Sequence, residues 1–206
     1  MNVYYNFDEA ETSISAKTIV TVGAFDGVHR GHRRLIREMN EIADNKELIP
    51  LVITFWPHPK QVLKGDAKLL STLEEKLFLL GEVGVQNVLV VNFTKEFSQI
   101  SHSDFLNQYL ITKLDAKAIV LSGDHHFGCD RQGSNKTIEE NNIETIVLPR
   151  YENISSSAVR DAIAKGDMTT AHKLLDAPYL IIEPVVDTAK IVPEAIDCNN
   201  VRVIKL

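Results

Sequence analysis

The chain of 206 residues is poor in cysteine, in long apolar runs and in excess positive charge, and each shortage excludes a class of protein. Its two cysteines, Cys129 and Cys198, lie far apart and form no CxxC pair, so they indicate neither a disulfide framework nor a structural zinc site. No run reaches the roughly 18 apolar residues that a membrane-spanning helix needs. The 22 Lys and Arg residues against 28 Asp and Glu give a net charge of -6, which argues against nonspecific attraction to nucleic acid or to an anionic membrane.

A targeting pattern is also missing from the first residues. Residues 1–17 contain acidic side chains and no basic stretch followed by an apolar one, so we expect no signal peptide. With so little cysteine, the sequence predicts a cytoplasmic protein. Its hydrophobic content of 44% is ordinary for a globular protein that buries a sizeable core.

Short apolar runs rich in β-branched residues recur along the chain. They are continuous rather than alternating, which is typical of strands buried on both faces of a parallel sheet. These runs cover residues 18–22, 51–55, 87–91, 118–121 and 145–148. Segments with helical periodicity cover residues 32–43, 72–82, 101–114, 155–165 and 168–175. The alternation predicts an α/β fold with a doubly wound, mainly parallel, five-stranded Rossmann-like sheet.

The C-terminal residues have a different pattern. Two β-type segments, YLIIEPVV and VRVIKL, flank a polar loop that contains proline. We therefore predict a main domain over residues 1–178 and a short β-hairpin-like tail over residues 179–206.

The stretch GAFDGVHRGH (residues 23–32) directly follows the first predicted strand. Ligands of doubly wound sheets bind where strands end and helices begin, and the N-terminus of the next helix attracts anions. His29 and His32, three residues apart, lie on one side of the first helical turn and can donate hydrogen bonds to phosphate oxygens. Gly31 lets a ligand approach the backbone closely. The residues alone leave open a plain turn with surface histidines, or a metal triad completed by Asp26.

Two further stretches carry polar groups at element ends. ISSSAVR (residues 154–160) opens a helix, where serines can cap the helix or bind an anion, and Arg160 can reach a phosphate with two N–H groups. WPHP (residues 56–59) holds His58 between two prolines after the second strand. A capped helix with a solvated arginine and a stiff loop with an idle histidine are the structural alternatives.

The stretch GDHHFG (residues 123–128) follows the fourth predicted strand. Its glycines are typical of a tight loop that contacts a ligand, and Phe127 can stack on a ring system. His125, His126 and Cys129 also permit a zinc site, although no fourth ligand stands at a fixed spacing.

Taken in order, these stretches resemble a known family. GAFDGVHRGH is similar to the HxGH signature of the nucleotidyltransferase superfamily, which holds the phosphates of a nucleoside triphosphate. The other stretches resemble motifs of the FAD synthetase (FMN adenylyltransferase) module in bacterial bifunctional riboflavin kinase/FAD synthetases: ITFWPHPKQVL, SGDHHFGCDRQG and ISSSAVRDAIAKGDMTTAHKLLDAPYLI. The resemblance covers roughly residues 18–186, and the PHP stretch makes the flavin branch specific.

The resemblance implies transfer of the adenylyl group of ATP to FMN, giving FAD and pyrophosphate, with Mg²⁺ on the ATP phosphates and no protein cage for it. The implied catalytic residues are His29, His32 and Arg160. Those implied to bind ATP or its phosphates are Gly23, Phe25, Asp26, Gly31, Ser155, Ser156 and Ser157. Those implied to bind FMN are Pro57, His58, Asp124, Phe127 and Gly128.

Departures from the family pattern keep alternatives open. His125 stands where the family usually has an aromatic residue, Ala24 where it usually has asparagine, and Ser157 where it has threonine. The glycine-x-proline-threonine-alanine-asparagine motif of the riboflavin kinase barrel does not occur in the sequence, so we expect no kinase activity from it. Open alternatives are another acceptor (nicotinate mononucleotide, pantetheine phosphate or a cytidylyl-transfer substrate), or a catalytically silent flavin- or nucleotide-binding protein. We expect no nucleic acid or membrane partner, and the sequence indicates no oligomeric state.

Overall fold

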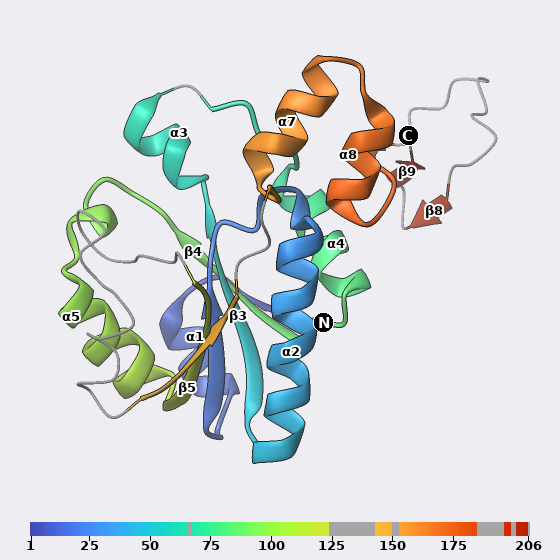
Figure 1. Ribbon diagram of the computed structural model, residues 1–206. Helices are drawn as coiled ribbons and strands as arrows, with labels where there is room; N and C mark the ends of the chain where they lie inside the picture. Colours follow the sequence, from blue (N-terminus) through green and yellow to red (C-terminus); the bar gives the residue numbers. More distant parts are fainter. Residues whose placement is uncertain (66, 124–142, 150–152, 185–195, 199–200, 206) are drawn as a thin grey trace. The chain divides into compact units, whose positions relative to one another are not determined.

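A computed structural model describes residues 1–65, 67–123, 143–149, 153–184, 196–198 and 201–205, with side chains up to residue 181 (Figure 1). The chain forms two compact units. Unit 1 comprises Met1–Ala24, Arg33–Ala67 and Gly81–Tyr151. Unit 2 comprises Phe25–His32, Lys68–Leu80 and Glu152–Leu206.

Unit 1 contains a six-stranded sheet in which every strand pairing is parallel, in the order β1-β4-β3-β2-β5-β6. Its strands are β1 (Asn2–Tyr4), β2 (Thr18–Val22), β3 (Ile49–Trp56), β4 (Asn87–Asn92), β5 (Ala116–Ser122) and β6 (Glu144–Leu148). The chain runs from β2 outward to β4 and then returns past β2 to β5, so the winding reverses beside β2. The doubly wound α/β fold is confirmed, and ligands of such sheets bind at the carboxyl end of strands beside this reversal.

The sheet has one strand more than the five predicted. β1 is three residues long and pairs with β4, where Asn2 lies opposite Asn87 and the two side chains share a hydrogen bond of 3.0 Å. A strand this short at a sheet edge has no recognisable apolar run, so the sequence pattern did not indicate it.

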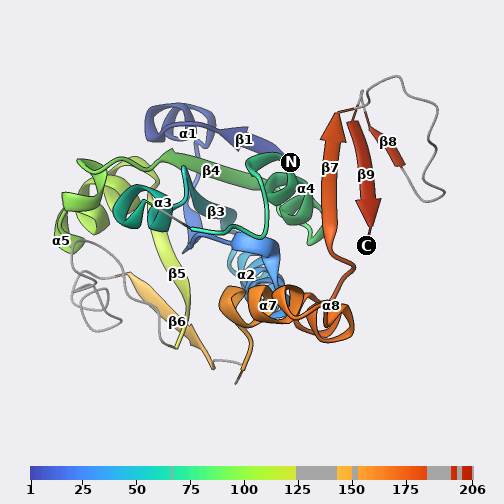
Figure 2. The same cartoon turned by 90° about the horizontal axis from the view of Figure 1, so that it is seen from above.

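Helices lie on both sides of the sheet (Figure 2). The helical segments before residue 115 are α1 (Phe7–Ser13), η1 (Asp26–Val28), α2 (Arg30–Lys46), α3 (Pro59–Lys64), α4 (Leu73–Glu82), η2 (Phe97–Gln99), α5 (His102–Asp104) and η3 (Phe105–Lys113). On one side, Phe7 of α1 and Leu106 and Leu110 of η3 pack into a buried core with alternate residues of the strands. On the other side, Ile36 and Met39 of α2 are fully buried.

Two helical segments differ from the sequence prediction. The helix predicted over residues 101–114 is present and is capped by Ser101, whose hydroxyl accepts the N–H of Asp104 at 3.0 Å, but from Phe105 it is π-helical. The predicted WPHP loop instead leads into α3: His58 is its N-cap and Pro59 stands in its first turn, where a missing N–H costs nothing.

Unit 2 contains the two predicted helices that follow the large sheet, α7 (Ser156–Ala164) and α8 (Met168–Leu175). They share a small core of Leu70, Val159 and Leu175. The C-terminal segment forms an antiparallel sheet in the order β7-β9-β8, made of β7 (Leu180–Pro184), β8 (Ile196–Cys198) and β9 (Val201–Lys205). The two predicted β-type segments pair as β7 and β9, and β8 is an additional strand. Within the described residues, no helix combines the length and the apolar character that crossing a membrane requires.

Candidate functional site

The turn after β2 has a strained backbone. Phe25, Gly27 and Val28 all have positive φ, at 48°, 74° and 39°. This region is rare for a β-branched residue such as Val28. A Cβ added to Gly27 would lie 2.7 Å from the Cδ1 atom of Leu70, so a larger residue there would force Leu70 or the turn to shift. Such strain persists only where the surroundings hold the backbone firmly, as at many ligand sites.

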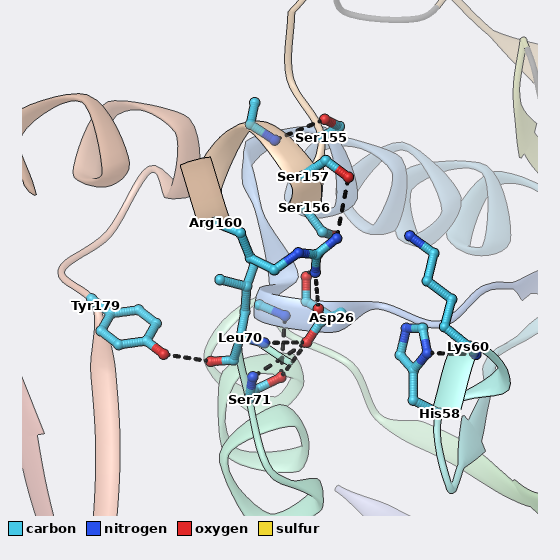
Figure 3. A network of polar contacts seen from close by, with 12 residues as sticks. Asp26, His58, Lys60, Leu70, Ser71, Ser155, Ser156, Ser157, Arg160 and Tyr179 are labelled. Carbon is cyan, nitrogen blue, oxygen red and sulfur yellow. Dashed lines mark hydrogen bonds and ion pairs between the residues drawn. The ribbon is translucent and has the colours of Figure 1, made fainter. Parts of the chain in front are cut away.

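The carboxylate of Asp26 is the centre of the network that holds this turn (Figure 3). Its side chain is only 3% exposed. Oδ1 accepts the backbone N–H groups of Leu70 at 2.8 Å and Ser71 at 3.2 Å, and the Ser71 hydroxyl lies at 3.5 Å. The Ser71 hydroxyl also accepts the N–H of Gly27 at 3.1 Å. Oδ2 pairs with Nη1 of Arg160 at 2.7 Å, so one carboxylate joins three segments that are distant in sequence.

The serines that begin α7 each have a different partner. Ser155 caps the helix by accepting an N–H three residues further on, at 3.2 Å. Ser156 donates its hydroxyl to the backbone carbonyl of Asp26 at 3.0 Å, and Ser157 accepts from Nη2 of Arg160 at 3.2 Å. Because Ser155 and Ser157 act here as acceptors, each keeps an O–H to give to an anion, whereas the O–H of Ser156 is already donated.

The two predicted imidazoles lie together. The rings of His29 and His32 stack with centroids 3.6 Å apart and planes at 15°. The backbone N–H of His32 donates to Nδ1 of His29 at 3.4 Å, which places the proton of neutral His29 on Nε2. The buried ring of Phe25 packs edge-on against His32 at 5.0 Å, so Phe25 supports an imidazole. A Cβ on Gly31 would come within 3.3 Å of the His29 ring, so the glycine leaves room for the stack.

Burial keeps both imidazoles neutral at pH 7. Burial lowers the pKa of His29 to about 4, against the opposing effects of a backbone hydrogen bond and the charge of Asp26. The pKa of His32 is lowered well below its usual range, first by burial and then by the repulsion that a protonated His32 would meet from His29 in its protonated form and from Lys76. Nδ1 of His32 is buried and has no hydrogen-bond partner within the described part of the chain. The pair therefore acts as neutral hydrogen-bonding groups in the absence of a ligand.

A buried lysine is a further charged residue in unit 2. α4 begins with a capping box, in which Thr72 and Glu75 exchange backbone-to-side-chain hydrogen bonds of 3.2 and 2.7 Å. One residue later, Lys76 is 1% exposed, and burial lowers its pKa to about 8 against the attraction of Asp26. Sequence analysis missed Lys76, although it stands three residues after Leu73 and four before Leu80, positions that share one face of a helix.

The metal-triad alternative is wrong for this turn. Among the residues that the structure describes, no group of three or more His, Cys, Asp or Glu side chains could hold a metal ion. Asp26 instead directs its oxygens to Arg160 and to backbone N–H groups, and Nδ1 of His29 accepts a backbone N–H. The zinc alternative involved residues 125–129, which lie outside the described residues.

The residues predicted to bind the acceptor belong to unit 1 or lie outside the described part. His58 is 6% exposed, and its Nδ1 accepts the N–H of Lys60 at 3.0 Å, which leaves Nε2 as the donor (Figure 3). Pro57 is exposed at the surface of unit 1. Gly23, predicted to bind phosphate, donates its N–H to the carbonyl of Ile53 at 3.0 Å. The predicted positions not described are Asp124, Phe127 and Gly128.

Comparison with protein families identifies the chain. The sequence model of a family described as FAD synthetase matches residues 11–158, which is well over half of the chain. The chain belongs to the FAD synthetase family. The match contains the turn that bears His29 and His32, the WPHP stretch and the serines at the start of α7. Arg160 stands two residues after the end of the match.

Individual relatives agree with this assignment. A bifunctional riboflavin kinase/FMN adenylyltransferase of Bacillus subtilis (strain 168) is 34% identical to this FAD synthetase-family chain over 176 residues, which are 81% of this chain and 55% of the relative. The chain thus spans slightly more than half the length of this relative. A crystal structure of a macrolide-efflux protein from Streptococcus pneumoniae is 28% identical with a TM-score of 0.79, covering 91% of this chain and 65% of that one. A pantoate-beta-alanine ligase from Francisella tularensis shares the fold. It is 16% identical with a TM-score of 0.53, and the match covers 85% of this chain and 78% of that one.

Proposed function

We propose that this chain transfers the adenylyl group of ATP to FMN, giving FAD and pyrophosphate. The observation that carries the proposal is the convergence within unit 2: the turn that bears His29 and His32 and the start of α7 meet at Asp26, although Ser156 and Asp26 are 130 residues apart in sequence. Family membership and the FMN adenylyltransferase name of the B. subtilis relative support the acceptor.

The chemistry asks for placement and charge neutralisation more than for proton transfer. The phosphate of FMN, with a second pKa near 6, is largely a dianion at neutral pH and needs no general base. One of its oxygens forms a bond to the α-phosphorus of ATP as the bond from that phosphorus to the β-phosphate oxygen breaks, and pyrophosphate leaves with the electron pair. Negative charge grows on the α-phosphate oxygens and on the leaving oxygen, where donors fixed in advance are most effective.

The residues of unit 2 suit this task in two ways. Arg160 supplies a permanent positive charge and N–H groups, while Ser155 and Ser157 each keep an O–H for an anion. Neutral His29 can donate from Nε2, and the arrival of a triphosphate would raise the depressed pKa of both imidazoles because negative charge stabilises the protonated form. The imidazoles can thus gain positive charge when the ligand brings negative charge.

The remaining assignments belong to the same proposal. We place His58 and Pro57 of unit 1 at the FMN phosphate or ring, together with Asp124, Phe127 and Gly128. Mg²⁺ would be held by the ATP phosphates, where it would neutralise part of their charge, and no step above depends on it. The proposed location is the cytoplasm, and the proposed partners are small molecules only.

Product analysis tests the proposal directly. The purified protein is incubated with ATP, Mg²⁺ and either FMN, riboflavin or nicotinate mononucleotide, and the products are separated by chromatography. We expect FAD from FMN, no FMN from riboflavin and no dinucleotide from nicotinate mononucleotide. We expect His32→Ala or Arg160→Ala to reduce turnover by about 100-fold or more, as loss of one transition-state donor does, with His102→Ala in α5 of unit 1 as the matched histidine control. A wild-type protein that forms no FAD would overturn the proposal.

A further inference from the structure

Asp26 is the unexpected member of the phosphate site. The family resemblance implies that it binds phosphate, yet a carboxylate is repelled by a phosphate unless a cation stands between them. Its side chain is 3% exposed, and the contacts described above use both of its oxygens. From this geometry we propose that Asp26 is a positioning residue, which acts on the ligand only by fixing the guanidinium of Arg160. The inference rests on one part of the proposed function, namely that this site of unit 2 binds phosphate.

The guanidinium of Arg160 is fixed at both ends of its fork. Nη1 is held by Asp26 at 2.7 Å and Nη2 by Ser157 at 3.2 Å. An arginine has five N–H groups, so these two hydrogen bonds leave three for an anion. The Arg160 side chain is 22% exposed, which keeps it within reach of a ligand.

The partner of Arg160 cannot move away. Oδ1 of Asp26 is anchored to the backbone N–H groups of Leu70 and Ser71, and its own carbonyl is bound by the Ser156 hydroxyl. A buried carboxylate that loses its cation is strongly disfavoured, so Arg160 is held where the carboxylate is. The site therefore presents an oriented guanidinium before the nucleotide arrives, and binding does not have to order a flexible side chain.

A double-mutant cycle tests the inference. Asp26→Asn keeps an acceptor oxygen for Leu70 and Ser71, but it turns an NH₂ group toward the donors of Arg160 and removes the charge. Binding of inorganic pyrophosphate is measured by calorimetry for wild type, Asp26→Asn, Arg160→Gln and the double variant. We expect each single change to weaken binding by about 10-fold or more, the usual scale for a lost charge-assisted hydrogen bond. The double variant should bind no more weakly than Arg160→Gln, because Asp26 acts through Arg160.

A matched control separates positioning from mere support of the fold. Ser71→Ala removes another contact of Asp26 and of Gly27 but leaves the ion pair with Arg160 intact. We expect it to lower the melting temperature while pyrophosphate binding stays close to that of wild type, because the ion pair that orients Arg160 remains. Should Asp26→Asn not fold, Arg160→Lys decides: it keeps the charge but lacks the fork, and we expect about 5-fold weaker binding or more.

The possible outcomes are distinct. Additive effects of Asp26→Asn and Arg160→Gln, or full binding by Arg160→Lys, would overturn the positioning role, and so would a wild-type protein that does not bind pyrophosphate. Non-additive binding in a protein that makes no FAD would support the positioning role while the proposed function fails. FAD synthesis by the wild-type protein, together with additive effects on pyrophosphate binding, would support the proposed function and overturn the positioning role.

Discussion

Acid should weaken unit 2 through the buried imidazole of His29. Burial lowers its pKa from the ordinary 6.5 to about 4 in the folded protein, so below pH 6.5 the unfolded chain takes up a proton that the folded chain refuses. The contribution of His29 to stability is therefore complete above pH 6.5 and is lost as the pH falls toward 4. Burial lowers the pKa of His32 in the same direction, so its effect adds to that of His29.

The size of the effect follows from the two pKa values. With 6.5 in the unfolded chain and about 4 in the folded one, His29 alone removes about 2 kcal/mol of unfolding free energy between pH 7 and pH 5. The side chain is only 8% exposed, so solvent screens this effect little. A loss of this size is a large fraction of the stability of an ordinary domain.

Two measurements check this prediction. Urea unfolding is followed at pH 7, 6 and 5 for wild type and for His29→Gln, with His102→Gln in unit 1 as control. The His29→Gln variant should lose about 2 kcal/mol less than wild type between pH 7 and 5. Titration of the imidazole signals by NMR should give His29 a midpoint near pH 4, below the range of the unfolding measurements, and saturating pyrophosphate should move the midpoint upward.

The reasoning fails if His29 titrates at its ordinary pKa, or if wild type and His29→Gln have the same pH dependence of stability. It also fails if pyrophosphate leaves the midpoint in place, because an anion beside a buried imidazole must favour the protonated form.

Two further predictions concern packing and buried charge. Gly27→Ala should lower the unfolding free energy by about 2–4 kcal/mol, and Gly65→Ala by only about 1 kcal/mol. Both glycines have positive φ, but a Cβ at Gly27 would lie 2.7 Å from Leu70, whereas one at Gly65 would have no atom within 4 Å. Equal losses in urea unfolding would contradict this prediction. Lys76→Met should raise the unfolding free energy by about 3 kcal/mol at pH 7 and by only about 1 kcal/mol at pH 9.5. The folded pKa of about 8 lies below the ordinary 10.5, so the free-energy cost of burying Lys76 becomes smaller as the pH rises and the unfolded chain also loses the proton. A gain that does not change with pH would exclude this cause.

Local sequence patterns predicted the large sheet because each of its buried strands is itself a continuous apolar run. β2 and β5 are recognisable without knowing their neighbours. The features that were missed depend on partners elsewhere in the chain. β1 is a strand only because β4 lies beside it, and α3 starts where it does because the His58 ring accepts the N–H of Lys60.

The site shows the same division. The sequence indicated that His29 and His32 lie close together, but not their stacking, because His29 precedes α2 with an extended backbone. The contacts of Asp26 were not visible, because two of its partners are backbone N–H groups, of Leu70 and Ser71, which leave no trace in residue types. Only the fold shows that its carboxylate pairs with a guanidinium 134 residues further on.

The electrostatics of unit 2 connect its stability with its ligand. Lys76 and the two imidazoles have lowered pKa values, so each disfavours the folded state over some range of pH. The charge of Asp26, which is paired with Arg160, opposes the lowered pKa values of His29 and Lys76 less strongly than burial lowers them. A bound polyphosphate would bring negative charge to unit 2 and would favour the protonated form of the same groups whose lowered pKa values disfavour the folded state. The groups that weaken unit 2 without a ligand are therefore those through which a phosphate ligand would stabilise it, and by linkage this stabilisation grows with ligand concentration.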